Sequence, residues 1–261
     1  MIIDQVRANF IKEMMKKSKR PDNRSLLEYR PVKVEKNVLE NPEGSAIAHI
    51  GSTKVLATVK FDLMAPFSDR PDEGVLMVGA EFPPLAHPDF ESGPPNETSI
   101  ELARVVDRGL RSAEAIDLKE LGKVKDKDGK VLGVFLDIYV MDHNGDLTDA
   151  SALACLAALS CAKVPKVDVE NSKLLRNDFV GPLKLNRSVV TVTFNHIEGN
   201  FIVDATDEEE IASDGQLTFG VTDDGLLCAG QKSGSMGLTK EKMVELSRIA
   251  IEQSKALINS V

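Results

Sequence analysis

The sequence predicts an α+β protein made of two similar lobes, each a sheet covered by helices. Strand-like segments come in two sets, and a long helical pattern follows each set. A stretch of mixed charge with two prolines, 163–187, separates the two sets. The two sets repeat in architecture and not in sequence, which predicts two lobes preceded by a separate N-terminal segment. The expected parts are an N-terminal helix and arm (1–28), a first lobe (29–163) and a second lobe with a C-terminal helix (164–261).

The N-terminal segment 2–19 has the spacing of an amphipathic helix. Its apolar residues recur every three or four positions and share one face, and Arg20-Pro21-Asp22-Asn23 ends the pattern. The predicted face consists of Ile3, Val6, Phe10, Met14 and, at its edge, Met15.

Short β-branched or alternating runs predict the first sheet. Gly51-Ser52-Thr53 is the expected turn between two of its strands, and a long proline-rich loop covers 83–95. The predicted strands are 32–38, 46–50, 55–61, 75–82 and 131–141.

Two helices are expected within the first lobe. The clearer one, 98–116, begins with Thr98 and Glu101 at the spacing of a capping box. The other, 149–162, is apolar nearly all round, which is typical of a helix buried on most sides. A charged turn around Asp128-Gly129 lies between them.

The second lobe repeats the order of strands and then helix. Asp223-Asp224-Gly225 is the expected turn between its last two strands. Thr239 is a suitable N-cap for the final helix, which should run to about residue 258. The predicted strands are 189–196, 201–203, 217–221 and 226–231.

Composition limits the classes of function. The net charge of −9 argues against a broad basic surface for nucleic acid, although a concentrated basic site remains possible. No run approaches the roughly 18 apolar residues of a membrane span. The three cysteines have no CxxC spacing and the four histidines match no zinc motif, so we expect a reducing cytosol and no metal site.

The strongest candidate site is an arginine stripe on the helix from Thr98. Arg104, Arg108 and Arg111 follow at i, i+4 and i+7, within about 60° of one another on the side opposite the apolar residues. The planar guanidinium suits phosphate, because it donates two parallel hydrogen bonds. The alternative is a solvated face in which Asp107 pairs with Arg111 and Glu101 with Arg104.

Two further segments have weaker claims. The acids between Asp204 and Asp214 could hold Mg²⁺ or act in acid–base chemistry, but such a run is more often a solvated loop or the first turn of a helix. The glycine-rich segment 230–237 lacks the Walker A pattern. It could cradle a phosphate, although a flexible strand-to-helix connection is the more common use.

Several segments in the same order resemble the RNase PH superfamily. Arg20-Pro21-Asp22-Asn23-Arg24 is similar to its opening RxDGR pattern, with Asn23 in place of Gly, and 51–57 is similar to its first hairpin. The segments 91–95, 101–111 and 177–186 resemble one branch, the inactive RNase PH-like subunit of the archaeal exosome. The resemblance covers about residues 20–255 and implies a duplicated β–α fold.

The resemblance also implies that this chain is catalytically silent. Active members bind phosphate with a Thr/Ser-Arg pair just before the buried helix, and that pair corresponds to Leu147-Thr148 here, flanked by two aspartates. They also carry an Asp that corresponds to a position near Gly215-Gln216, although Asp214 is one residue away. The chain should therefore have no catalytic residues of its own and bind no cofactor or metal.

In the exosomes that the sequence resembles, three silent and three active subunits alternate in a hexameric ring. The silent chain contributes arginines that hold RNA, and Arg104 and Arg108 match them. The resemblance implies a cytoplasmic subunit of a 3′-to-5′ RNA-degrading complex, with phosphate and Mg²⁺ at the catalytic RNase PH-like partner. It also implies RNA-binding cap subunits and single-stranded RNA as partners. The alternatives are an active phosphate-dependent exoribonuclease of RNase PH type and a metal-dependent hydrolase that uses the acids of 204–214.

Overall fold

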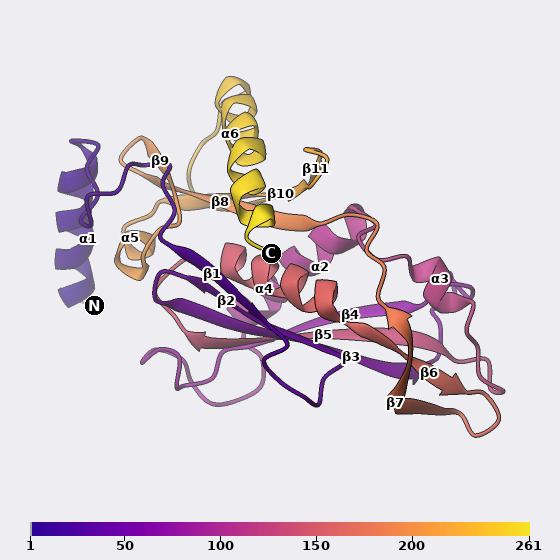
Figure 1. Ribbon diagram of the computed structural model, residues 1–261. Helices are drawn as coiled ribbons and strands as arrows, with labels where there is room; N and C mark the ends of the chain where they lie inside the picture. Colours follow the sequence, from indigo (N-terminus) through magenta and orange to yellow (C-terminus); the bar gives the residue numbers. More distant parts are fainter. Residues whose placement is uncertain (1) are drawn as a thin grey trace.

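The computed structural model describes residues 2–261, with side chains from Asp4 onward, and it has four layers (Figure 1). A five-stranded sheet, a pair of helices, a four-stranded sheet and the C-terminal helix follow one another. This architecture confirms the prediction of an α+β fold with two sheet-plus-helix units. One hydrophobic core runs through both units and includes Phe61, Leu153 and Phe194.

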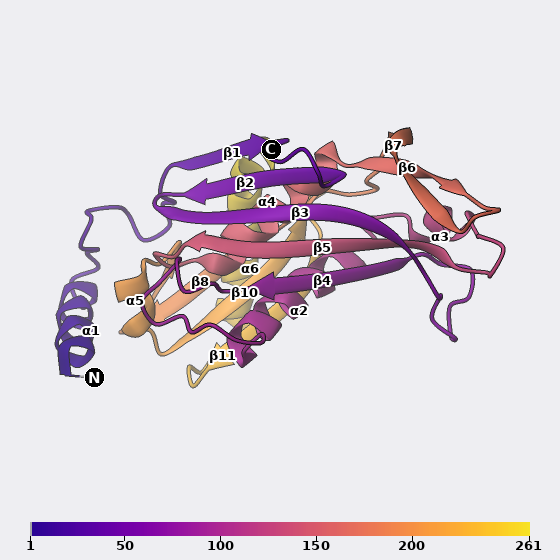
Figure 2. The same ribbon diagram turned by 90° about the horizontal axis from the view of Figure 1, so that it is seen from below.

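The first sheet has the strand order β1-β2-β3-β5-β4, seen from below in Figure 2. Its neighbours are antiparallel except for β4 and β5, which are parallel because a helical crossover joins them. The strands are β1 (Val32–Lys36), β2 (Gly44–Ile50), β3 (Thr53–Met64), β4 (Val75–Glu81) and β5 (Val131–Asp142).

The second sheet has the order β11-β10-β8-β9 and is antiparallel throughout. The helix α6 (Lys240–Asn259) packs on β8 and β10 at its outer face, and Thr239 caps it as predicted by accepting from the Lys242 N–H. The strands are β8 (Val189–Ile197), β9 (Asn200–Val203), β10 (Gly215–Thr222) and β11 (Leu227–Gly234).

The helix α4 (Leu147–Cys161) lies between the two sheets. It packs on β2 and β3 on one side and on β8 on the other. This position explains why the helix is apolar all round, as the sequence predicted.

The helix α2 (Glu97–Ser112) starts one residue earlier than predicted and has a different cap. Asn96 is the N-cap, and its side chain accepts a hydrogen bond from the Ser99 N–H at 2.9 Å. The predicted capping box of Thr98 and Glu101 is therefore wrong. Asn and Thr both cap helices, and the extended backbone at Asn96 decides between them. A short helix, α3 (Leu118–Gly122), follows.

The segment between the two sheets contains a hairpin that the sequence did not predict. The strands β6 (Lys163–Asp168) and β7 (Lys173–Pro182) form a separate two-stranded sheet. The register shifts on both sides of Pro165, where the missing N–H interrupts the ladder.

The N-terminal helix α1 (Ile2–Met15) stands at one end of the molecule beside the short helix α5 (Asp207–Ile211) (Figure 2). It ends four residues before the predicted end, and its buried face differs from the prediction. Met15 of the predicted face is buried, together with Ile11, against Ile197 and Ile202, whereas Val6 and Phe10 are 64% and 58% exposed. The side chain of Ile3 lies outside the described part of the chain. Two apolar stripes overlap on this helix, and contact with α5 and β9 selects one of them.

Among the described residues, no helix is long and apolar enough to cross a membrane.

Candidate functional site

Arg104 and Arg108 lie on the exposed side of α2, and Leu102, Val105 and Val106 are buried on the other side. Nη1 of Arg108 donates to Oε1 of Gln231 in β11 at 2.8 Å. Arg104 has no hydrogen bond or ion pair to any residue that the structure describes. The guanidinium of Arg104 is therefore free to bind an anion.

Arg111 has different contacts from the other two arginines. It pairs with Asp107, with 2.8 Å between Nε and Oδ2, and also donates to the backbone oxygen of Leu76. The predicted Asp107–Arg111 pair is thus confirmed. The predicted Glu101–Arg104 pair is wrong, because Glu101 accepts from Nε2 of Gln231 at 3.2 Å instead.

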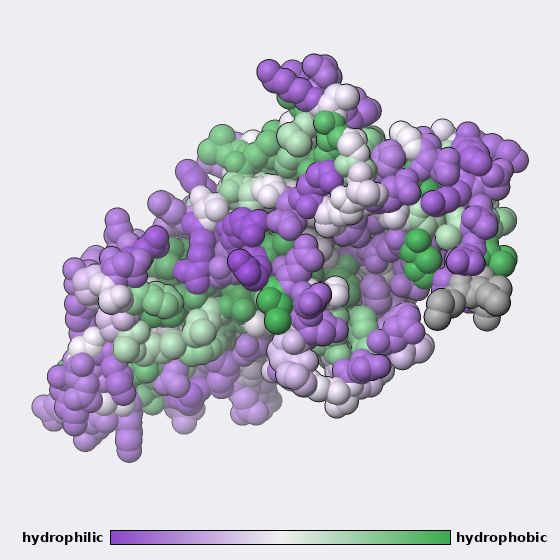
Figure 3. Space-filling model, turned by 180° about the vertical axis from the view of Figure 1, so that it is seen from behind, coloured by the Kyte–Doolittle hydropathy of each residue, from purple (hydrophilic) through white to green (hydrophobic). Residues whose placement is uncertain are grey.

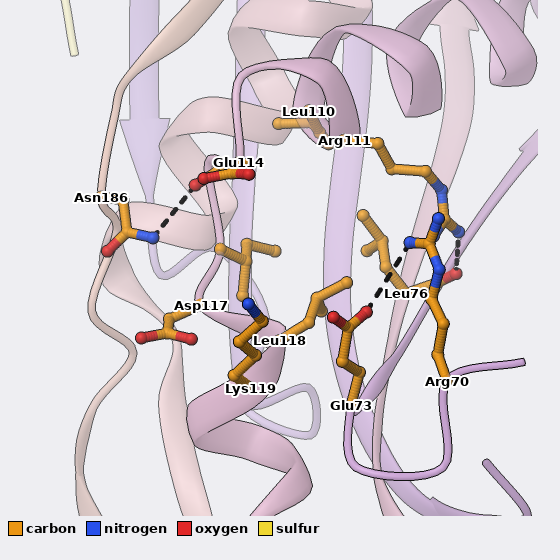
Figure 4. A pocket seen from close by; sticks show the side chains of 11 residues that line it. Arg70, Glu73, Leu76, Leu110, Arg111, Glu114, Asp117, Leu118, Lys119 and Asn186 are labelled. Atoms are coloured by element: carbon orange, nitrogen blue, oxygen red, sulfur yellow. Dashed lines mark hydrogen bonds and ion pairs between the residues drawn. The ribbon is translucent and has the colours of Figure 1, made fainter. Parts of the chain in front are cut away.

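Arg111 faces a cavity of about 360 Å³ near the C-terminal end of α2 (Figure 4). Arg70 lies beside it and pairs with Glu73 at 3.6 Å, and Asn186 donates to the backbone oxygen of Glu114. Three cationic and three acidic side chains line this cavity. Because Arg70 and Arg111 are both paired with carboxylates, neither guanidinium is free to attract an anion into the cavity.

A second pocket, of about 190 Å³, is lined in part by Gln231. Leu147 and Thr148, where the resemblance places a missing phosphate-binding pair, also line it, and so does Gln216, near which the resemblance places a missing Asp. The full lining is Phe82, Phe90, Thr98, Glu101, Leu102, Val105, His143, Leu147, Thr148, Glu210, Gln216, Thr218, Gln231 and Ser233.

A carboxylate of the chain itself occupies part of the N-terminus of α4. Asp146 is the N-cap, in the left-handed region at φ 51°, and its backbone N–H donates to Oε1 of Glu210 at 2.9 Å. Its own carboxylate is buried and has no hydrogen-bond partner among the described residues. Burial, reinforced by the charges of Asp149 and Asp204, raises the pKa of Asp146 well above its usual value.

Neighbouring carboxyls have raised pKa values for the same reason. Burial raises the pKa of Glu210 to about 7 and that of Asp149 to about 6, although Tyr29, Thr191 and Thr193 hydrogen-bond to Asp149. A helix N-terminus usually attracts anions. Here the carboxyls of Asp146, Asp149 and Glu210 crowd this helix end, and Glu210 accepts the hydrogen bond of its first backbone N–H.

The acidic run is a structural element. Asp207–Ile211 forms α5, capped by a box of Thr206 and Glu209, so the expectation of a first helical turn is confirmed. Asp204 and Glu209 are fully buried and so are not solvated. Arginines from the segment 20–30 neutralise their charges. Neither has a free carboxylate for a metal. The exposed Asp214 lies 3.6 Å from Nζ of Lys12.

Two histidines that are distant in sequence meet beside this acidic helix. His87 and His143 have ring centroids 5.1 Å apart, and their Nε2 atoms lie 3.7 and 3.6 Å from the carboxylate of Asp207. His143, Asp207 and Glu210 bring ligand atoms within 4.8 Å of one another. However, Nδ1 of His143 accepts from the Gly145 N–H, so the neutral ring carries its proton on Nε2. A histidine that binds a metal normally donates through its other nitrogen, so this group does not fit a cation well.

The glycine-rich segment is mostly strand. Residues up to Gly234 belong to β11 and pair with β10, and only the last three residues connect towards α6. A Cβ on Gly234 would lie 2.5 Å from the Cα of Gly215, so close strand packing requires this glycine. The segment therefore does not form a phosphate-binding loop.

An aromatic cluster beside the pocket was not anticipated from the sequence. The ring of Phe90 is stacked on His143, with centroids 5.4 Å apart, and its centroid lies 5.0 Å from that of Phe82. The proline-rich loop 83–95 folds back to bring these rings together. The only signal in the sequence was that Phe82 directly precedes this loop and Phe90 lies within it.

Comparison with known proteins identifies similar chains. The family model "3′ exoribonuclease family, domain 1" matches residues 28–165, and "domain 2" of the same family matches 188–253. "Exosome complex component Rrp42" of Thermococcus onnurineus is 38% identical over all of this chain and 96% of its own length. The protein of that name from Aeropyrum pernix is 41% identical over 95% of this chain and 90% of its own.

Two solved structures have the same fold over nearly the whole chain. One is a chain of the Archaeoglobus fulgidus exosome with RNA bound to the active site, at TM-score 0.89 and 38% identity, with 98% of both chains covered. The other is a chain of an archaeal exosome core, at TM-score 0.85 and 35% identity, with 98% of this chain and 96% of that chain covered.

Proposed function

The chain belongs to the RNase PH family of 3′ exoribonucleases, and we propose that it is the non-catalytic RNase PH-like subunit of an archaeal exosome. In this role it contributes RNA-binding arginines and helps to form the active site of a catalytic RNase PH-like partner. The named relatives that it matches over nearly their full length are components of such complexes.

The pocket beside the N-terminus of α4 carries the proposal of catalytic silence. Leu147-Thr148 supplies no cationic side chain, Gln216 supplies no carboxylate, and Glu210 takes the backbone N–H of Asp146. A phosphate nucleophile in this pocket would meet the carboxyls of Glu101 and Glu210 and no arginine or lysine from the lining residues. Phosphorolysis requires cationic stabilisation of the reacting phosphate, which the lining residues of this pocket do not supply.

The RNA-binding role rests on the exposed side of α2. The guanidinium of Arg104 has no partner in the described chain, and Arg108 is bound only to a neutral amide. Their free donors suit the phosphates of single-stranded RNA. A small cluster of this kind can bind RNA even on a protein whose net charge is −9.

We further propose the partners and the compartment. Three copies of this chain would alternate with three catalytic subunits in a cytoplasmic hexameric ring that binds RNA-binding cap subunits. Phosphate and Mg²⁺ would act at the catalytic partner. The surface in Figure 3 carries several apolar patches separated by hydrophilic residues, and exposed side chains such as Val6, Phe10 and Val180 suit burial between subunits.

Reconstitution tests this function. The chain is mixed with the second RNase PH-like protein of the same genome, and the mass of the product is measured. Phosphate-dependent release of nucleoside diphosphates from RNA is then compared for the chain, the partner and the complex. We expect a stable hetero-oligomer that is active and a chain that is inactive alone. Robust release by a preparation free of the partner would indicate an active enzyme, and a monomer that ignores the partner would contradict the subunit role.

A further inference from the structure

The pocket that contains Leu147-Thr148 and Gln216 is a formed cavity lined by two kinds of group. The apolar groups are Leu102 and Val105 of α2, Leu147 of α4 and the rings of Phe82 and Phe90. Its volume of about 190 Å³ is below the roughly 300 Å³ of sites for drug-sized molecules. The cavity is therefore suited to a single planar ring system and not to a whole nucleotide.

The second kind of lining group is neutral and hydrogen-bonding. The side chains of Gln216, Thr148 and Ser233 have no hydrogen-bond partner among the described residues, although all three line the pocket. An amide and hydroxyls can each donate and accept, as the edge of a polar heterocycle requires.

The charged groups of the lining are already engaged. Glu101 accepts from Gln231, and Oε1 of Glu210 accepts from the backbone of Asp146. No lysine or arginine is among the lining residues described by the structure. A phosphate would have no counterion inside the pocket, whereas an uncharged aromatic ring would need none.

The rim of the pocket connects it to the arginines. Gln231 lines the pocket and binds both Glu101 and Arg108, and Arg104 lies one turn of α2 before Arg108. RNA whose phosphates are held by these two arginines would therefore pass the mouth of the pocket.

We propose that this pocket, which is the counterpart of an active site, binds an unpaired nucleobase of the RNA strand held by Arg104 and Arg108. The base packs against the rings of Phe82 and Phe90, and its polar edge meets Gln216 and the neighbouring hydroxyls. This proposal rests on the proposed RNA-binding function and adds a base-binding site to it. The chain then anchors the strand at two kinds of group, while the chemistry takes place in the partner.

Methyl NMR of the reconstituted complex tests the proposal, with isotope labels in the leucine and valine methyls of this chain only. Adenosine, cytidine and uridine are titrated, and the methyls of Leu102, Val105 and Leu147 are followed. We expect saturable shifts at these three residues and none at Leu76 or Leu118, which line the other cavity. Labelling one chain separates this binding from any binding at the partner.

Two substitutions on different elements make the test specific. Phe90→Leu should weaken nucleoside binding about tenfold, as expected when a stacking ring is lost, and Gln216→Leu should weaken it by a similar factor. Phe67→Leu is the matched control, because Phe67 is 51% exposed and lies outside this pocket. Unchanged Leu76 and Leu118 signals show that a variant is folded. If Phe90→Leu does not fold, Gln216→Leu tests the proposal in its place.

Separate arms distinguish the other outcomes. Inorganic phosphate alone should not shift the three methyls, and methylguanidinium should not either. Shifts with methylguanidinium but not with nucleosides would mean that the occupant is a cationic side chain, which overturns the proposal. Absent nucleoside shifts, or equal affinity in wild type and both variants, would also overturn it. The double variant Arg104→Ala/Arg108→Ala should still bind nucleosides, so a failure of the arginine function is recognised separately by its effect on RNA affinity.

Discussion

Oε1 of Glu210 accepts a hydrogen bond from the backbone N–H of Asp146 at 2.9 Å, and this contact joins α5 to the N-terminus of α4. The N–H groups at a helix N-terminus are generally available to an anion such as phosphate. Here a glutamate of the same chain takes that place, in a region where three carboxyls have raised pKa values.

The raised pKa of Glu210 predicts how stability depends on pH. Because the pKa is about 7 in the folded chain and about 4.3 when unfolded, the folded chain binds more protons between these values. The contribution of Glu210 to the free energy of unfolding should therefore be greatest below pH 4.3 and be lost as the pH rises towards 7. Glu210→Gln should stabilise the chain by about 1–3 kcal/mol at pH 8 and have little effect near pH 4.5. Urea midpoints at several pH values measure this, with the exposed Glu252→Gln as control, and equal slopes for the two variants would contradict it.

Replacing Arg104 and Arg108 with Ala should weaken RNA binding and leave assembly intact. Both side chains are exposed on α2, so the core is unaffected. If each arginine neutralises one phosphate, the log–log salt dependence of affinity should flatten by about 0.7 per lost contact on single-stranded RNA. RNA affinity at several salt concentrations and the decay rate of the complex are measured.

Arg111→Ala is the matched control on the same helix, because Asp107 and the backbone of Leu76 already engage that guanidinium. It should reduce RNA affinity less than the double change does. Unchanged affinity, slope and rate in a correctly assembled Arg104→Ala/Arg108→Ala complex would mean that the stripe is only a solvated face.

The buried pair of Arg20 and Glu209 should be essential for stability. Both side chains are fully buried, and two hydrogen bonds of 2.9 and 2.6 Å join them. Arg20→Met alone should cost about 3–5 kcal/mol, because it leaves an unpaired buried charge. Arg20→Met/Glu209→Leu should cost less than the two single changes together. Denaturant midpoints test this, and Lys33→Met at an exposed pair should cost about 1 kcal/mol or less.

The cap of α2 gives a test of its start. Asn96→Ala should destabilise the chain by about 1 kcal/mol, because the Ser99 N–H loses its acceptor. Thr98→Ala should have little effect, since Thr98 is already inside the helix. If Thr98→Ala costs more stability than Asn96→Ala in urea denaturation, the cap would be the Thr98–Glu101 box expected from the sequence.

Elements with a long, regular pattern were predictable from sequence. The arginine stripe opposite an apolar face placed Arg104 and Arg108 on the exposed side of α2, and the all-apolar run of 149–162 predicted a helix buried on both sides. Thr239 was also predictable as a cap, because an N-cap needs only local backbone geometry and one side chain. These features depend on interactions within a few residues or on burial alone.

Features that depend on residues far apart in the chain could not be predicted from the sequence. The buried face of α1, the pairing of Arg20 with Glu209, and the meeting of His87 with His143 all arise from contacts across many residues. So does the pocket that unites Leu147-Thr148, Gln216 and Phe90. The pattern of residues was sufficient to predict the α+β class and the exposed arginines. It could not determine which of two apolar stripes is buried or which acids are neutralised, because packing between distant segments sets the solvation and the counterion of each group.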